Sequence, residues 1–156
     1  MDSASLAMLI EMAKAARDAA ATRAAQARVQ VDQARQQLEL LRGYARDYDR
    51  RSMATLSQGV DLAAQNNLRA FVGKLGHAVE VQQAEVTRRE SVLAQANGEL
   101  LQMRTRLGSL EKLAERNEQT AQTKARRQEQ RTLDEMASRV RRDTGFGSNE
   151  LVTSDW

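Results

Sequence analysis

Residues 72–121 read VGKLGHAVEVQQAEVTRRESVLAQANGELLQMRTRLGSLEKLAERNEQTA. Every seventh position of this stretch holds a small or apolar residue: Val72, Val79, Val86, Leu93, Leu100, Leu107, Ala114 and Ala121. Apolar residues also stand three places further on in the same register: Leu75, Ala96, Met103 and Leu110. Two such positions per seven residues form the contact line of a coiled coil. We therefore expect a long helix that packs against another helix.

The composition of the chain supports long helices and a narrow core. The 156 residues include no proline, and only 3% are aromatic. Proline breaks helix interiors, so its absence permits helices of any length. A single histidine and no cysteine leave no basis for a metal site or a cofactor. We predict an all-α rod whose core is a line of contacts between helices.

A second apolar line precedes the first in the chain. Its members are spaced three or four residues apart: Leu6, Leu9, Ala13, Ala16, Ala20, Ala24, Ala27, Val31, Ala34, Leu38, Leu41, Ala45 and Tyr48. Alanine allows helices to approach closely but buries little area, and stabilisation scales with buried apolar surface. We expect weak packing in the alanine-rich part and tighter packing from Leu38 to Tyr48.

The helical period lapses between the two lines, where Ser52, Ser57 and Gly59 occur close together. This pattern predicts a first arm over about 4–49, a connection over about 50–61 and a second arm over about 62–142. Residues 1–142 then form one domain, a single antiparallel coiled-coil hairpin. The glycine-rich and serine-rich segment 143–156 is predicted to be a disordered tail.

Antiparallel arms with equal rise per residue place Tyr48 near Phe71 and Leu6 near Leu113. The second arm is then the longer one. From about residue 114 its contact line also turns polar, and includes Asn117, Lys124, Gln128 and Arg131. We expect residues 114–142 to extend beyond the hairpin as a lone helix, which lacks the tertiary packing that stabilises most helices.

Catalysis is not expected from this sequence. The carboxylates are spread along the predicted helices, whereas acid–base catalysis needs paired groups in a shared cleft. Glycine-rich phosphate loops, nucleophile elbows and zinc-binding helix motifs are missing from the sequence. We therefore predict a protein that is not an enzyme and takes no small-molecule ligand. A basic segment near the end of the second arm is diluted by acidic residues, which argues against nucleic acid as the partner.

Residues 38–86 resemble the FliJ family of flagellar export proteins. The resemblance is carried by Leu41, Tyr44 and Tyr48, a turn with serine and glycine, and then Phe71, Leu75 and Ala78. It implies a stalk-like antiparallel coiled coil of the flagellar type III protein export apparatus. Its implied partners are the hexameric export ATPase, the membrane export gate and export chaperones. The implied location is the cytoplasm, peripheral to the inner membrane at the base of the flagellum.

The resemblance also suggests two binding regions. It places export-gate contacts near the turn, at Gln37, Leu41, Tyr44, Tyr48, Phe71, Leu75 and Ala78. Gln82 stands where the family pattern has histidine, so gate contact here is arranged differently or is weaker. For the ATPase ring we hypothesise contacts through the basic residues of the projecting helix: Lys124, Arg126, Arg127, Arg131 and Arg139.

Three other interpretations remain open at this stage. The injectisome stalk proteins of virulence secretion share the same architecture. A general coiled-coil scaffold or homodimer would show the same heptads, although we expect a monomer. A basic nucleic-acid binder is the third. Mass in solution separates a hairpin monomer from a dimer, and a salt-dependent shift with random DNA would favour the nucleic-acid binder.

Overall fold

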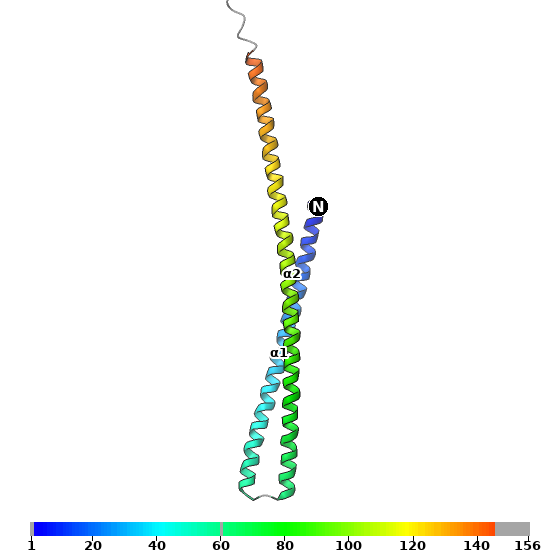
Figure 1. Ribbon diagram of the computed structural model, residues 1–156, viewed down its shortest axis with the longest axis vertical. Helices are drawn as coiled ribbons and strands as arrows, with labels where there is room; N and C mark the ends of the chain where they lie inside the picture. Colours follow the sequence, from blue (N-terminus) through cyan, green and yellow to red (C-terminus); the bar gives the residue numbers. More distant parts are fainter. Residues whose placement is uncertain (1, 60, 146–156) are drawn as a thin grey trace, which may run out of the picture.

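The protein forms two long helices that lie side by side and run in opposite directions (Figure 1). The structure is a computed structural model that describes residues 2–59 and 61–145. Helix α1 spans Ser3–Ser57, and helix α2 spans Leu62–Gly145. Helix α2 is the longer, and its last part projects beyond the N-terminus of α1. The predicted all-α hairpin with a longer second helix is confirmed.

The contact line between the helices follows the two predicted apolar stripes. Each predicted position of α1, from Leu6 to Tyr48, is buried or half-buried. The same holds for α2 from Val72 to Ala114, whereas Ala121 is exposed. The rings of Tyr48 and Phe71 pack in a tilted arrangement with centroids 4.6 Å apart, and the antiparallel register predicted that these residues lie close together. The seven-residue period therefore specified both the face and the partner of each helix.

The distribution of burial differs from our expectation. The buried residues of α1 run from Leu6 to Leu38, and most of them are alanines. Between Leu38 and the turn no residue of α1 is buried, and in α2 the first buried residue is Val86. The prediction of tighter packing over Leu38–Tyr48 was therefore wrong. Small side chains let the helices approach closely enough to exclude water, whereas the bulkier residues near the turn are only partly covered.

The connection between the helices is shorter than the predicted 50–61. Helix α1 continues to Ser57, with Gln58 as its C-cap. The hydroxyl of Ser57, one of the residues that suggested a break, instead donates to the carbonyl of Ala54 at 2.7 Å, and the hydroxyl of Thr55 donates to the carbonyl of Arg51 at 2.7 Å. Gly59 has φ of 71°, a conformation that favours glycine and ends the helix.

The far end of α2 also extends slightly past its predicted limit. Residues 143–145 belong to the helix, although the sequence placed them in a disordered tail. The rest of that predicted tail, residues 146–156, lies outside the described residues. The described part of the projecting helix therefore runs to Gly145.

Between two apolar clusters of the contact line, hydrogen-bonded polar side chains lie at the level of the buried Val31. One cluster contains Ala24, Ala27 and Ala96, and the other contains Ala34, Leu38 and Val86. Between them, Arg89 of α2 donates hydrogen bonds to Gln30 of α1 and, at 2.7 Å, to Glu85. Hydrogen bonds from Arg88 and from Arg89 lower the pKa of Glu85 to about 2. Polar residues at contact positions are known to specify coiled-coil register.

Candidate interaction surfaces

The turn-end surface comprises the seven residues that the family resemblance implied as export-gate contacts. They lie on both helices in the part of the hairpin nearest the turn, but they differ in accessibility. Gln37, Tyr44 and Phe71 are exposed. The half-buried members lie on the contact line itself: Leu41, Tyr48, Leu75 and Ala78. A partner that approaches the closed hairpin reaches only part of this set.

The aromatic residues of the turn-end surface have separate roles. Tyr48 and Phe71 pack on each other with their ring planes inclined by 58°. The guanidinium of Arg51 lies 5.6 Å from the centroid of the Tyr48 ring, within the range of a cation–π interaction. Tyr44 is 55% exposed and takes no part in this packing. One aromatic pair thus joins the helices while Tyr44 is free to contact a partner. The heptad pattern gave no indication of a role for Arg51.

Gln82, at the position where the family pattern has histidine, bridges the two helices. Its amide donates to the backbone carbonyl of Ala34 at 3.0 Å and to the side-chain oxygen of Gln37 at 3.2 Å. Gln37 is therefore bonded within the hairpin, and its amide NH₂ group remains available as a donor. Gln82 and Arg89 are seven residues apart in the contact register. This spacing was the sequence signal that polar side chains occupy two positions of the contact line.

The overhang, residues 115–145 of α2, is exposed at every position. It carries all five cations that we hypothesised to contact an ATPase ring: Lys124, Arg126, Arg127, Arg131 and Arg139. The ion pairs found in the described residues involve none of these five. Their charges are therefore not neutralised within the hairpin.

Helical geometry sorts the overhang residues onto two faces. At about 100° per residue, Lys124, Arg127 and Arg131 share one face, which continues the line of contact with α1. Leu133, Met136 and Val140 lie on the opposite side of the helix and are 58–62% exposed. Arg126 falls closer to this apolar side. The overhang is thus amphipathic, and the hairpin covers neither of its faces.

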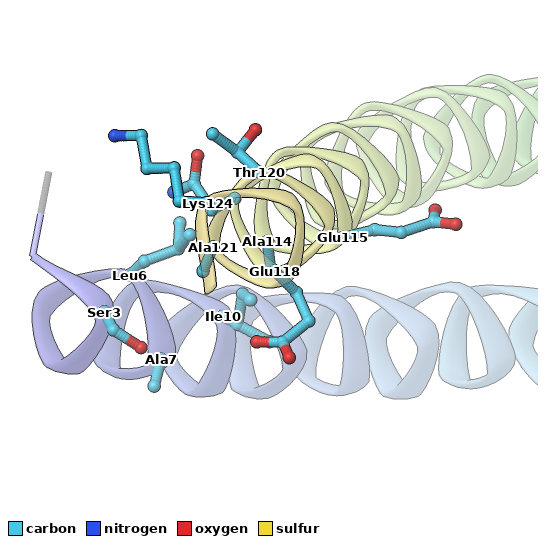
Figure 2. Close-up of a pocket in the computed structure, with 11 residues that line it drawn as sticks. Ser3, Leu6, Ala7, Ile10, Ala114, Glu115, Glu118, Thr120, Ala121 and Lys124 are labelled. Atoms are coloured by element: carbon cyan, nitrogen blue, oxygen red, sulfur yellow. The ribbon is translucent and has the colours of Figure 1, made fainter. Parts of the chain in front are cut away.

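An open groove lies where α1 ends against α2. Figure 2 shows Leu6 and Ile10 of α1 directed toward Ala114 and Ala121 of α2, with Lys124 at the outer end. The groove encloses about 710 Å³ and is also lined by Glu115 and Glu118. The heptad pattern did not predict this groove, which arises where the small Ala114 and Ala121 face the first turns of α1. The groove connects the hairpin with the base of the overhang.

The described residues offer no sign of metal chemistry. In residues 2–59 and 61–145, no group of three or more histidine, cysteine, aspartate or glutamate side chains is placed to hold a metal ion. Within the same ranges, neither helix has a stretch that is both apolar and long enough to span a bilayer.

These features define an antiparallel coiled-coil stalk, with one surface at its turn and a bare amphipathic helix at its other end. The chain belongs to the FliJ family: residues 1–144 match the family model described as Flagellar FliJ protein. The match covers both helices, and it makes the protein a component of flagellar type III export. Comparison with curated proteins and with solved structures gives no significant match.

Proposed function

We propose that this protein is the non-catalytic stalk of the flagellar export ATPase: its overhang enters the hexameric ring and promotes ring assembly and ATP hydrolysis. The observation that carries this proposal is the uncovered, two-faced overhang. A lone helix in water lacks the packing that stabilises most helices. A ring surrounds a helix on all sides, and so contacts the basic face of Lys124, Arg127 and Arg131 together with the apolar face of Leu133, Met136 and Val140.

The basic face determines which ring surface is complementary. Cations without ion-pair partners in the described chain fit acidic loops at a ring entrance. Charges of this kind mainly accelerate encounter and make binding sensitive to salt. The apolar face then supplies contacts that persist at high ionic strength, because burial of apolar surface does not depend on charge. Binding should therefore weaken with salt without disappearing.

Charge reversal on the overhang tests the proposal directly. We expect Lys124→Glu with Arg127→Glu and Arg131→Glu to lower affinity for the cognate export ATPase by about tenfold or more. The matched control reverses three exposed cations of α2 within the hairpin: Arg104→Glu, Arg106→Glu and Lys112→Glu. Both variants carry the same change in net charge, and circular dichroism checks that both remain helical. Equal affinity of the two variants for the ATPase would refute a specific role of the overhang.

A second contact is proposed at the turn-end surface, where the membrane export gate binds. Tyr44 supports this assignment, because its ring is 55% exposed and aromatic residues are enriched at protein interfaces. We expect Tyr44→Ala to weaken gate binding and to leave ATPase stimulation unchanged. Loss of both activities together would indicate a general structural defect. We also propose that export chaperones bind the stalk and that the protein acts as a monomer at the cytoplasmic face of the inner membrane.

A nucleic-acid function and an injectisome role are alternatives that the same purified protein can test. Absence of a salt-dependent shift with random DNA would exclude the first. Stimulation of the flagellar export ATPase, but not of an injectisome ATPase, would separate the second. Measuring ATP hydrolysis with and without the protein is the most informative single experiment.

A further inference from the structure

We propose that the tip of the hairpin, residues 43–57 and 62–76, opens as a separate unit while the remaining coiled coil stays closed. This opening would regulate access to the turn-end surface, and in that respect it rests on the proposed gate contact. The opening itself is a property of the free chain. Three independent observations carry the inference: the distribution of burial, the positions of three glycines and the placement of the half-buried site residues.

The first observation is that the tip contains no buried residue. All buried residues of α1 lie between Leu6 and Leu38, and those of α2 lie between Val86 and Leu107. Regions with few buried apolar contacts open locally at lower free energy than the core of the same protein. The Tyr48–Phe71 pair is the one aromatic contact that joins the helices within the described tip.

The second observation concerns Gly43, Gly73 and Gly76 in the helix interiors. A glycine in a helix often allows another backbone to approach closely, but here an added Cβ would meet nothing within 4 Å at any of the three. These glycines therefore serve no packing role and lower helix propensity. Gly43 stands five residues before Tyr48, and Gly76 stands five residues after Phe71. In the antiparallel register, the two glycines lie at the same level on opposite helices.

The third observation is the partial burial of the turn-end surface. Tyr48 and Leu75 face the contact line inside the tip, and Leu41 and Ala78 lie on the contact line at its base. Separation of the two helices beyond Gly43 and Gly76 would uncover Tyr48 and Leu75 and free the edges of Leu41 and Ala78. A partner that uses all seven residues would then select the open tip, and its apparent affinity would fall with the fraction of open molecules.

Hydrogen exchange of the full-length protein tests the opening without any partner. We expect backbone amides at 43–57 and 62–76 to exchange at least about tenfold faster than those at 20–38 and 86–107. The triple variant Gly43→Ala, Gly73→Ala and Gly76→Ala should slow tip exchange by about tenfold or more, because alanine favours the helix. Similar protection of the tip and the core, or no effect of the triple variant, would overturn the inference.

The matched control uses glycines of the closed part of α2. Gly98 and Gly108 also have open space where a Cβ would lie. We expect Gly98→Ala with Gly108→Ala to leave exchange at the tip unchanged. An equal slowing of tip exchange by this control would show that the hairpin opens only as a whole.

Binding of the detergent-solubilised cognate export gate then tests the regulatory part. The glycine triple variant should bind more weakly by the same factor as its tip exchange slows. Met53→Gly should show faster tip exchange and tighter gate binding, because glycine lowers helix propensity. Met53 is 76% exposed, so the substitution removes little packing. Unchanged gate affinity in both variants would overturn regulation while the gate contact itself stands. Failure of the unmodified protein to bind the gate would refute the gate contact and its regulation, whatever the exchange rates.

Discussion

Two leucines of α1, two positions apart, provide a sharp test of the packing. Leu38 is 5% exposed and packs in a cluster with Ala34 and Val86, whereas Leu40 is 60% exposed. Truncation of Leu38 to alanine removes about three carbon groups, at about 0.8 kcal/mol each. Measured costs for buried leucines range over about 2–5 kcal/mol. The contact between two helices is open to water on both sides, so we expect the lower end, about 2 kcal/mol.

The assay is urea denaturation followed by circular dichroism. Leu38→Ala should lower the free energy of unfolding by about 2 kcal/mol, and Leu40→Ala should change it by less than about 0.5 kcal/mol. Both substitutions alter helix propensity equally, so the difference between them reports burial alone. Equal effects of the two substitutions would refute the assigned contact face. A midpoint that rises with protein concentration would instead indicate that the unit of folding is a dimer.

Three further predictions concern particular positions. Glu85→Gln should flatten the acid dependence of stability: the lowered pKa of Glu85, about 2, stabilises the fold above pH 4.5, and this contribution is lost as the pH falls towards 2. Acid titration of the free energy of unfolding checks this, and parallel curves for variant and wild type would contradict it. Gly59→Ala should destabilise the turn by about 1 kcal/mol, because φ is 71° there; thermal melting measures the loss. Ala96→Leu should cost about 1–3 kcal/mol by overpacking the cluster with Ala24 and Ala27, and an unchanged melting temperature would show that the helices separate freely there.

Much of the fold followed from the spacing of residues along the chain. The apolar positions recur with a period close to that of the helix, so the spacing alone assigned each contact face. The same spacing, together with equal rise along both arms, predicted the Tyr48–Phe71 contact. It also predicted where α2 becomes fully exposed, because the contact line turns polar beyond Ala114. These are local regularities that a one-dimensional pattern records directly.

At the turn, the prediction made from local residue types was wrong. Ser52, Ser57 and Gly59 belong to residue types that often end helices, and their closeness suggested a connection from about residue 50. In the structure, the hydroxyls of Thr55 and Ser57 bond to carbonyls of the preceding turn, so α1 continues to Ser57. The choice between ending and continuing a helix rests on small energy differences that neighbouring packing decides.

The candidate surfaces, too, could be predicted only in part from the sequence. Residue type and register were sufficient to place the five cations on a bare helix and Tyr48 near Phe71. Residue type and register did not predict the accessibility of the turn-end surface, because this accessibility depends on how closely the two helices approach at each level. Alanines allow close approach from Leu6 to Leu38, and bulkier side chains prevent it nearer the turn. The sequence by itself determined which faces of the two helices meet. Only the tertiary structure decided how tightly they meet, since that distance is set jointly by side chains far apart in the chain.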